Sequence, residues 1–276
     1  MLQNKQIECV IMDWAGTTID FGCFAPVNAF GKAFEEISVK ISTKEIRLPM
    51  GTAKIEHIRQ LLQMERIRQT FQNIHHRDWN EEDVINLNSS FERHLFATLE
   101  KYTDPLPHVV EITSLLRQQG IKIGSTTGYT RAMMNVVEPS ARLKGYFPDC
   151  CATPDGLPKG RPAPFMIFRN LIDLNVQNSD CAVKIGDTME DIREGLNAKT
   201  FTIGVIFGSS ELGLSEMEIK NMSKVKLKEQ VAIVRRKMLE AGAHYVIDSM
   251  AELPKIINQI NSQLTIERHC KTIVPQ

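Results

Sequence analysis

Five short apolar segments, each about as long as a β-strand, are spread along this chain, and most are followed by a helical pattern. They lie at 7–12, 121–125, 181–185, 201–206 and 244–247. Parallel strands need crossover connections, so strands that alternate with helices are typical of a parallel sheet with helices on both faces. The sequence therefore predicts an α/β fold with a Rossmann-like parallel sheet.

The segment 22–102 interrupts this alternation. Strand patterns are missing there, and apolar residues recur at helical spacing over 55–62 and again over 84–99. An all-helical segment inserted after the first strand is typical of a lid. We therefore predict an α/β core domain of 1–21 and 103–276 and an inserted helical cap domain of 22–102.

Charge and hydropathy exclude several classes of protein. Lys plus Arg and Asp plus Glu are equal at 33 each, which removes the basic excess typical of nucleic-acid binding. The first residues lack the apolar stretch of a signal peptide, and no apolar run approaches the ~20 residues that span a bilayer. We expect a cytoplasmic protein that binds a small molecule, neither nucleic acid nor membrane.

A carboxylate stands at the end of the first apolar segment. Asp13 follows that segment directly and leads into the turn Trp14-Ala15-Gly16. A carboxylate on a tight turn after a buried strand has the position of a nucleophile, although an Asp that caps an ordinary strand-to-helix turn gives the same pattern. The sequence therefore marks Asp13 as a candidate nucleophile.

A second acidic strand end lies near residue 187. A short apolar strand ends in Gly186, and Asp187 and Asp191 follow at the predicted start of a helix. Aspartates four residues apart on a helix repel each other unless a cation lies between them. The carboxyl ends of parallel strands meet at one edge, so Asp13 and these aspartates are able to share one Mg²⁺ ion.

Two further segments favour an oxyanion ligand. Hydroxyl groups and free backbone N–H groups gather at 125–130, at another strand end, although a polar helix cap explains this segment equally well. Arg161 lies in the loop Gly160-Arg161-Pro162, just before a predicted helix at 164–174. Its guanidinium can hold a phosphoryl oxygen, and the alternative is a solvated loop residue.

A lysine and a histidine stand together in the helical segment. Pro49 and Gly51 break the chain, and Lys54 follows in the first turn of a predicted helix with His57 three residues later on the same face. The helix dipole disfavours a charged lysine there, which lowers its pKa and favours an imine-forming amine. The alternative is a solvated lysine beside a structural histidine.

Four of these groups, in this chain order on an alternating α/β pattern, resemble the haloacid dehalogenase superfamily. They are the turn after Asp13, the segment 125–130, the Arg161 loop and the segment 186–191. The resemblance implies Asp13 as the nucleophile, and one Mg²⁺ per subunit bound by Asp13, the Ala15 carbonyl and Asp187, with Asp191 beside them or bound through water. It also assigns phosphoryl oxygens to a set of donors: Thr126 or Thr127, the Gly128 N–H and Arg161.

A closer resemblance covers residues from about 6 to about 262. The segments that carry it are 13–18, 22–26, 50–57, 125–131, 160–162 and 208–214, which look like those of the phosphonoacetaldehyde hydrolase family. That resemblance implies hydrolysis of the C–P bond of phosphonoacetaldehyde to acetaldehyde and phosphate. It implies a Schiff base at Lys54, an aspartyl phosphate at Asp13, and a homodimer associated through the cap.

Ala15 fits this chemistry. Phosphatases with such a nucleophile usually carry a second Asp two residues on, which protonates an alcohol leaving group, whereas this chain has a methyl group. A C–P bond has no leaving oxygen, and a protonated imine at Lys54 supplies the electron sink instead. The alternatives are a dehalogenase-like hydrolase, which does not need Asp187 and Asp191, and a non-catalytic ligand-binding member of the superfamily.

The remaining site residues are expected around the pocket between cap and core. We expect His57 to shuttle protons near the imine, because its pKa would lie near the operating pH. Met50, Gly51, Cys23 and Tyr129 are expected to shape or polarise the pocket, and apolar packing is an equal interpretation for Met50 and Cys23.

Overall fold

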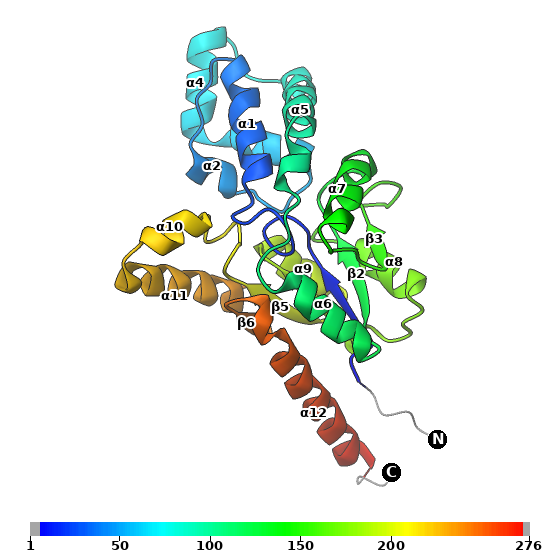
Figure 1. The fold of residues 1–276 in the computed structure, drawn as a ribbon. Helices are drawn as coiled ribbons and strands as arrows, with labels where there is room; N and C mark the ends of the chain where they lie inside the picture. Colours follow the sequence, from blue (N-terminus) through cyan, green and yellow to red (C-terminus); the bar gives the residue numbers. More distant parts are fainter. Residues whose placement is uncertain (1–5, 273–276) are drawn as a thin grey trace.

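The computed structural model contains one six-stranded sheet in which all neighbouring strands are parallel (Figure 1). It describes residues 6–272, with side chains described as far as Thr265. The strands are β1 (Cys9–Met12), β2 (Lys122–Thr126), β3 (Cys150–Ala152), β4 (Ala182–Gly186), β5 (Phe201–Val205) and β6 (Tyr245–Ile247). The predicted α/β fold is confirmed, and β3 is the strand that the sequence pattern missed.

The strand order β3-β2-β1-β4-β5-β6 places β1 at the centre of the sheet. The chain runs outward from β1 through β2 to β3, and then returns to the other side of β1 to form β4. The point where the order reverses therefore lies between β1 and β4. In open α/β sheets, ligands bind in the crevice beyond the carboxyl ends of the strands at such a point.

Helices cover both faces of the sheet, as the buried central strands require. Cys9 and Ile11 of β1 pack in a cluster with Ile167, while Val10 and Met12 belong to a cluster on the other face. The helices outside the segment 22–102 are α6 (Val109–Gln118), α7 (Arg131–Leu143), α8 (Phe165–Asp173), α9 (Met189–Asn197), α10 (Glu216–Asn221), α11 (Lys224–Glu240) and α12 (Leu253–Thr272). Within the described range, no helix combines the length and apolar character needed to cross a bilayer.

The segment 22–102 is helical, as its pattern predicts. It contains α1 (Phe24–Glu36), α2 (Thr43–Arg47), α3 (Lys54–Gln63), α4 (Glu65–His75) and α5 (Glu81–Phe96), and a short 3₁₀ turn at Leu99–Tyr102. Phe30 of α1 stacks on Phe91 of α5 with ring centroids 4.1 Å apart. In Figure 1 these helices, in blue to green, form a group of their own beside the sheet. The division into core and cap domains stays a prediction.

Candidate active site

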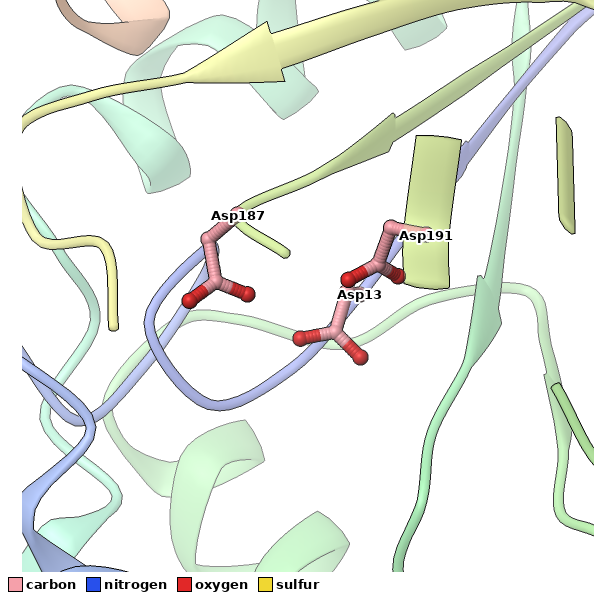
Figure 2. Close-up of side chains that lie close together, drawn as sticks. All are labelled: Asp13, Asp187 and Asp191. Carbon is pink, nitrogen blue, oxygen red and sulfur yellow. The ribbon is translucent and has the colours of Figure 1, made fainter. Parts of the chain in front are cut away.

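Three aspartates meet at the reversal point of the sheet. Asp13 directly follows β1, and its N–H donates to the carbonyl of Ile185 in β4 at 2.9 Å. Asp187 follows β4, and Asp191 lies in the first turn of α9. All three are buried, and each offers a carboxylate oxygen within 4.8 Å of the other two (Figure 2). The expectation that the two acidic strand ends lie together is met by this geometry.

The three carboxylates experience different electrostatic environments. Burial raises the pKa of Asp187 well above its ordinary value, and repulsion from Asp13 and Asp191 adds to the effect. Burial also raises the pKa of Asp13, although Arg161 opposes that rise. For Asp191 burial acts in the same direction, but Arg161 and Lys184 outweigh it and lower the pKa. Asp187 is therefore the carboxylate that most lacks a neighbouring positive charge.

The donor set fits a divalent cation. Four carboxylates (Asp13, Asp187, Asp191 and Glu194) lie in one buried cluster with two cations, Arg161 and Lys184. With all of them ionised, four negative and two positive charges leave an excess of two negative charges. Buried oxygen ligands with that excess match what Mg²⁺ prefers in proteins.

The turn after Asp13 lies directly against Asp187. Gly16 has a φ of +87°, and a Cβ on this residue would lie 2.4 Å from Oδ2 of Asp187. Only glycine allows this close approach without strain. Ala15, the preceding residue, lines the pocket beside the aspartates and brings a methyl group, not an acid.

Arg161 is buried and holds three carboxylates at once. Its Nη2 is 2.6 Å from Oδ1 of Asp13, its Nη1 is 3.0 Å from Oδ1 of Asp191, and its Nε is 3.0 Å from Oε2 of Glu194. The alternative interpretation of Arg161 as a solvated loop residue is therefore wrong. The fork of the guanidinium fixes the Asp13 carboxylate relative to α9.

Sequence reasoning missed two fully buried charged residues of this network. Nζ of Lys184, in β4, is 2.8 Å from Oδ1 of Asp191 and 3.3 Å from Oε2 of Glu194. The available signals were a lysine inside an apolar strand and a glutamate three residues after Asp191, on the same face of the helix. Behind the pocket, Lys184 thus holds the Asp191 carboxylate and Glu194 holds the Arg161 guanidinium.

The two adjacent threonines have different environments. The hydroxyl of Thr126 is buried in the charged network, where it accepts from Arg161 at 2.7 Å and from Lys184 at 2.8 Å and donates to Glu194 at 3.1 Å. Thr127 lines the pocket instead. Its hydroxyl accepts from the Tyr129 N–H at 3.0 Å. Thr127 is therefore the threonine with access to a ligand.

The structure shows a helix cap at the end of the segment 125–130, and it places other residues of the segment, expected to bind an oxyanion, in the pocket wall. Thr130 caps α7, with its hydroxyl accepting from the Met133 N–H. Thr127, Gly128 and Tyr129 line the pocket. The segment is thus a helix cap at its end and a pocket wall before it.

Lys54 reaches this pocket from the other side. It is the first residue of α3, and its Nζ is 5.7 Å from the ring centroid of Tyr129. A Cβ on Gly128 would lie 3.9 Å from the same Nζ. The pKa of Lys54 is lowered as predicted, but burial is the main cause, not the helix dipole on which the prediction rested. The interpretation of Lys54 as a solvated lysine is wrong.

His57 does not behave as the sequence led us to expect. Burial, with help from Lys54, lowers its pKa to about 3, so the expectation of a pKa near operating pH is wrong. Its Nε2 lies 2.8 Å from the carbonyl of Ile46, and its ring stacks on Phe30 at 4.1 Å. His57 is absent from the pocket lining, and a neutral, packed ring is a poor proton shuttle.

The pocket is small: it encloses about 350 Å³ of space in total, part of which is open solvent. It is lined by Asp13, Ala15, Cys23, Pro26, Met50, Gly51, Lys54, Thr127, Gly128, Tyr129, Arg161, Asp187 and Thr188. Of the predicted site residues, the structure leaves His57, Thr126 and Asp191 behind this lining. Pro26 and Thr188 line it without having been predicted. Met50 and Cys23 both line the pocket and pack in the apolar core, so neither interpretation excludes the other.

The fold and the acidic strand ends define a class of hydrolase. The family model for haloacid dehalogenase-like hydrolases matches residues 7–199 of the chain, a range that includes β1, β4 and the whole pocket. The predicted resemblance to that superfamily is confirmed.

Similarity to individual proteins identifies one family within this class of hydrolase. The chain is 54% identical over 260 residues to a phosphonoacetaldehyde hydrolase of Bacteroides fragilis, covering 94% of this chain and 99% of the relative. It is 48% identical to one of Bacillus cytotoxicus, covering 94% and 98%. The crystal structure of a phosphonoacetaldehyde hydrolase-like protein of Oleispira antarctica matches with a TM-score of 0.92 and 35% identity over 95% of each chain. The chain belongs to the phosphonoacetaldehyde hydrolase family.

Proposed function

We propose that this protein hydrolyses the C–P bond of phosphonoacetaldehyde to give acetaldehyde and phosphate. One observation carries the proposal: a lysine with a lowered pKa lies in the same pocket as Asp13 and Arg161, while residue 15 brings no acid. An amine that is uncharged for part of the time attacks aldehydes, and a carboxylate held by an arginine is suited to attack phosphorus. The names of the relatives support the same substrate.

The first half of the reaction would join the substrate to Lys54. The amine attacks the aldehyde carbon and water leaves, which gives an imine that is protonated on nitrogen. Asp13 then attacks phosphorus, and the electron pair of the breaking C–P bond moves toward the iminium nitrogen. The products of this step are an enamine on Lys54 and an aspartyl phosphate on Asp13.

The second half would regenerate both residues. One water hydrolyses the aspartyl phosphate and releases phosphate. The enamine takes a proton on carbon, and another water hydrolyses the resulting iminium to acetaldehyde and the free Lys54 amine. One water is released and two are consumed, so the sum is the hydrolysis of one C–P bond by one water.

Charge is balanced by the residues around the phosphoryl group. Arg161, the Thr127 hydroxyl and the Gly128 N–H would hold its oxygens. Asp13, the Ala15 carbonyl and Asp187 would hold one Mg²⁺ per subunit, with Asp191 beside them, and the ion when bound neutralises charge on the phosphoryl oxygens. The excess of two negative charges in the cluster supports this metal site.

His57 is not retained as the proton shuttle. The low pKa and packed position of His57 favour a role in holding the start of α3, on which Lys54 lies. Tyr129 lines the pocket, and its ring centroid is 5.7 Å from Nζ of Lys54. Burial raises the pKa of Tyr129 well above its ordinary value. Its hydroxyl therefore stays protonated and is suited to donate a hydrogen bond near the imine.

A cytoplasmic homodimer completes the proposal. Association through the helical segment is supported by apolar side chains exposed on it, including Ile74 of α4 and Ile85 and Phe96 of α5. Exposed apolar residues of this kind are common at contacts between subunits.

The test of the function is phosphate release from phosphonoacetaldehyde with and without a chelator. We expect release that stops with EDTA and returns with Mg²⁺, because the clustered carboxylates repel one another when the cation is removed. Simple phosphate esters serve as the control and should give little phosphate. Release that is indifferent to EDTA would favour a dehalogenase-like hydrolase, and no release at all would favour a non-catalytic member of the superfamily.

A second prediction concerns Ala15. The change Ala15→Asp should lower the rate of phosphate release from phosphonoacetaldehyde by about tenfold or more, since a like charge close by shifts a carboxylate by at least ~1 pKa unit, or ~1.4 kcal/mol. Ala15→Asn is the matched control of similar size without the charge, and it should lose much less. A faster C–P cleavage in Ala15→Asp would contradict our account of why the acid is missing.

A further inference from the structure

The loop 208–214, which follows β5, contacts three separate parts of the molecule. The Ser210 N–H donates to Oδ2 of Asp187 at 2.7 Å. The Gly208 carbonyl accepts from the N–H of Gly22, at the start of the helical segment, at 2.7 Å. Arg47, the last residue of α2, donates from Nη1 to the carbonyl and the hydroxyl of Ser210 at 3.2 and 3.3 Å. One serine thus joins the helical segment to a candidate metal ligand.

The loop is shaped to admit Arg47. Gly213 has a φ of +66°, and a Cβ on it would lie 2.9 Å from Nε of Arg47. The guanidinium also lies over the ring of Phe24, 5.1 Å from its centroid. The arginine therefore packs against both the first residue of α1 and the loop, with no room for a larger residue at 213.

The contact between Arg47 and the loop contributes less stability than a fully paired arginine would. Among the described residues, Nε and Nη2 of Arg47 are buried without a hydrogen-bond partner, and only Nη1 is satisfied. Burial lowers the pKa of Arg47, opposed by Asp187 and Asp20 among others. A guanidinium that leaves two donors unpaired gives up much of the stability that it could supply. The role of its two hydrogen bonds to Ser210 is therefore better explained by the position in which they hold that residue.

We infer that Arg47 is a positioning residue that fixes the Ser210 N–H on Asp187 when the helical segment lies over the pocket. Arg47 ends α2 and Lys54 begins α3 seven residues later, so both side chains belong to neighbouring helices of the helical segment. Closure that brings Lys54 to the pocket would then also orient Asp187 for the cation. The consequence for the reaction rests on the proposed function. The carboxylates would reach the geometry that the reaction needs only when Lys54 is in the pocket.

The test uses the full-length protein and compares three variants. Arg47→Met keeps an unbranched apolar stem over Phe24 and removes the donors to Ser210. Arg47→Lys keeps a cation whose single ammonium group can donate to Ser210. Arg66→Met is the matched control, because Arg66 of α4 is exposed and pairs with Glu45 of α2 without touching the loop. If Arg47 only packed against Phe24, the methionine variant would behave like the wild type.

Two measurements need no substrate. One is amide hydrogen exchange of the peptide that contains 208–214, and the other is the Mg²⁺ concentration that half-saturates the thermal stabilisation of the protein. For Arg47→Met we expect exchange to accelerate and half-saturation to rise, each by about tenfold, the lower end of what losing an outer-shell partner does to metal affinity. Arg47→Lys should recover part of both effects, and Arg66→Met should match the wild type.

Equal exchange and equal half-saturation in Arg47→Met and the wild type would overturn the inference. If Arg47→Met does not fold, Ser210→Ala removes one acceptor and keeps the amide, and it should raise half-saturation in the same direction; an unchanged value would also overturn the inference. A wild type that binds Mg²⁺ but releases no phosphate would defeat the proposed function while leaving this coupling intact. The two ideas therefore fail separately.

Discussion

An arginine in place of Lys54 is expected to lower phosphate release from phosphonoacetaldehyde by more than about a thousandfold, the scale of loss when a covalent catalyst is removed. Guanidinium keeps the positive charge of lysine but stays protonated, so it forms no imine under these conditions. The carbon that leaves phosphorus then has no electron sink. Electrostatic help from residue 54, if that were its role, would survive the change.

The measurement pairs phosphate release with borohydride trapping. With wild type and either phosphonoacetaldehyde or acetaldehyde, borohydride should inactivate the protein irreversibly and add the mass of the reduced adduct to the peptide that contains Lys54. Lys54→Arg should give no adduct and should keep its thermal stabilisation by Mg²⁺, because Asp13 and Asp187 are unchanged. Lys44→Arg, at an exposed lysine of α2, is the control and should resemble the wild type in every measurement.

A substantial residual rate in Lys54→Arg would contradict the proposed chemistry. The same holds for an adduct that forms equally on Lys44 or on other exposed lysines, since the selectivity should follow from the buried amine. Burial lowers the pKa of Lys54, so its uncharged fraction at neutral pH exceeds that of a solvated lysine. Trapping should therefore retain Lys54 selectivity as the pH is lowered toward neutrality.

Most of the sheet could be predicted from the sequence because its strands are buried on both faces. Buried parallel strands are nearly continuous apolar runs, and such runs are easy to find. The strand β3 (Cys150–Ala152) was missed because it has three residues and follows Pro148 closely. A segment that short has too few residues to establish a pattern, and its pairing with β2 is a tertiary property.

The residues of the pocket could be predicted where the strand order alone decides their position. Asp13 and Asp187 follow neighbouring parallel strands, so they meet wherever the strands end. His57 and Thr126 were harder, because the direction of a side chain depends on the packing of its helix or strand against others. His57 turns toward Phe30 and Ile46, and Thr126 turns into the charged network behind the pocket.

The buried partners of the site could not be derived in the same way. Lys184 and Glu194 carry charges that are normally solvated, and their burial is possible only because each meets opposite charges from other segments. Those partners lie on β4, α9 and the Arg161 loop, so no local pattern contains them. Local spacing predicted the acids, and only the fold shows what neutralises them.

Asparagine in place of Asp13 should remove phosphate production almost completely, by about four to six orders of magnitude, as expected when a nucleophile is lost. The amide is nearly isosteric with the carboxylate but does not attack phosphorus. Lys54 should still form its imine, because that step precedes the attack and uses neither oxygen of Asp13. Phosphate assays and borohydride trapping on the same sample separate the two steps.

The same variant should fold normally. Burial raises the pKa of Asp13 above its ordinary value. The folded state therefore loses stability as the pH rises above that ordinary value and Asp13 ionises, and a neutral amide removes this cost. Without Mg²⁺ we therefore expect Asp13→Asn to melt no lower than the wild type, although Arg161 loses a charged partner at 2.6 Å. With Mg²⁺ it should gain less stability than the wild type, because one candidate ligand has lost its charge. Phosphate release near the wild-type rate in a folded Asp13→Asn protein would exclude Asp13 as the nucleophile, whereas loss of both release and trapping would mean that the two residues do not act in successive steps.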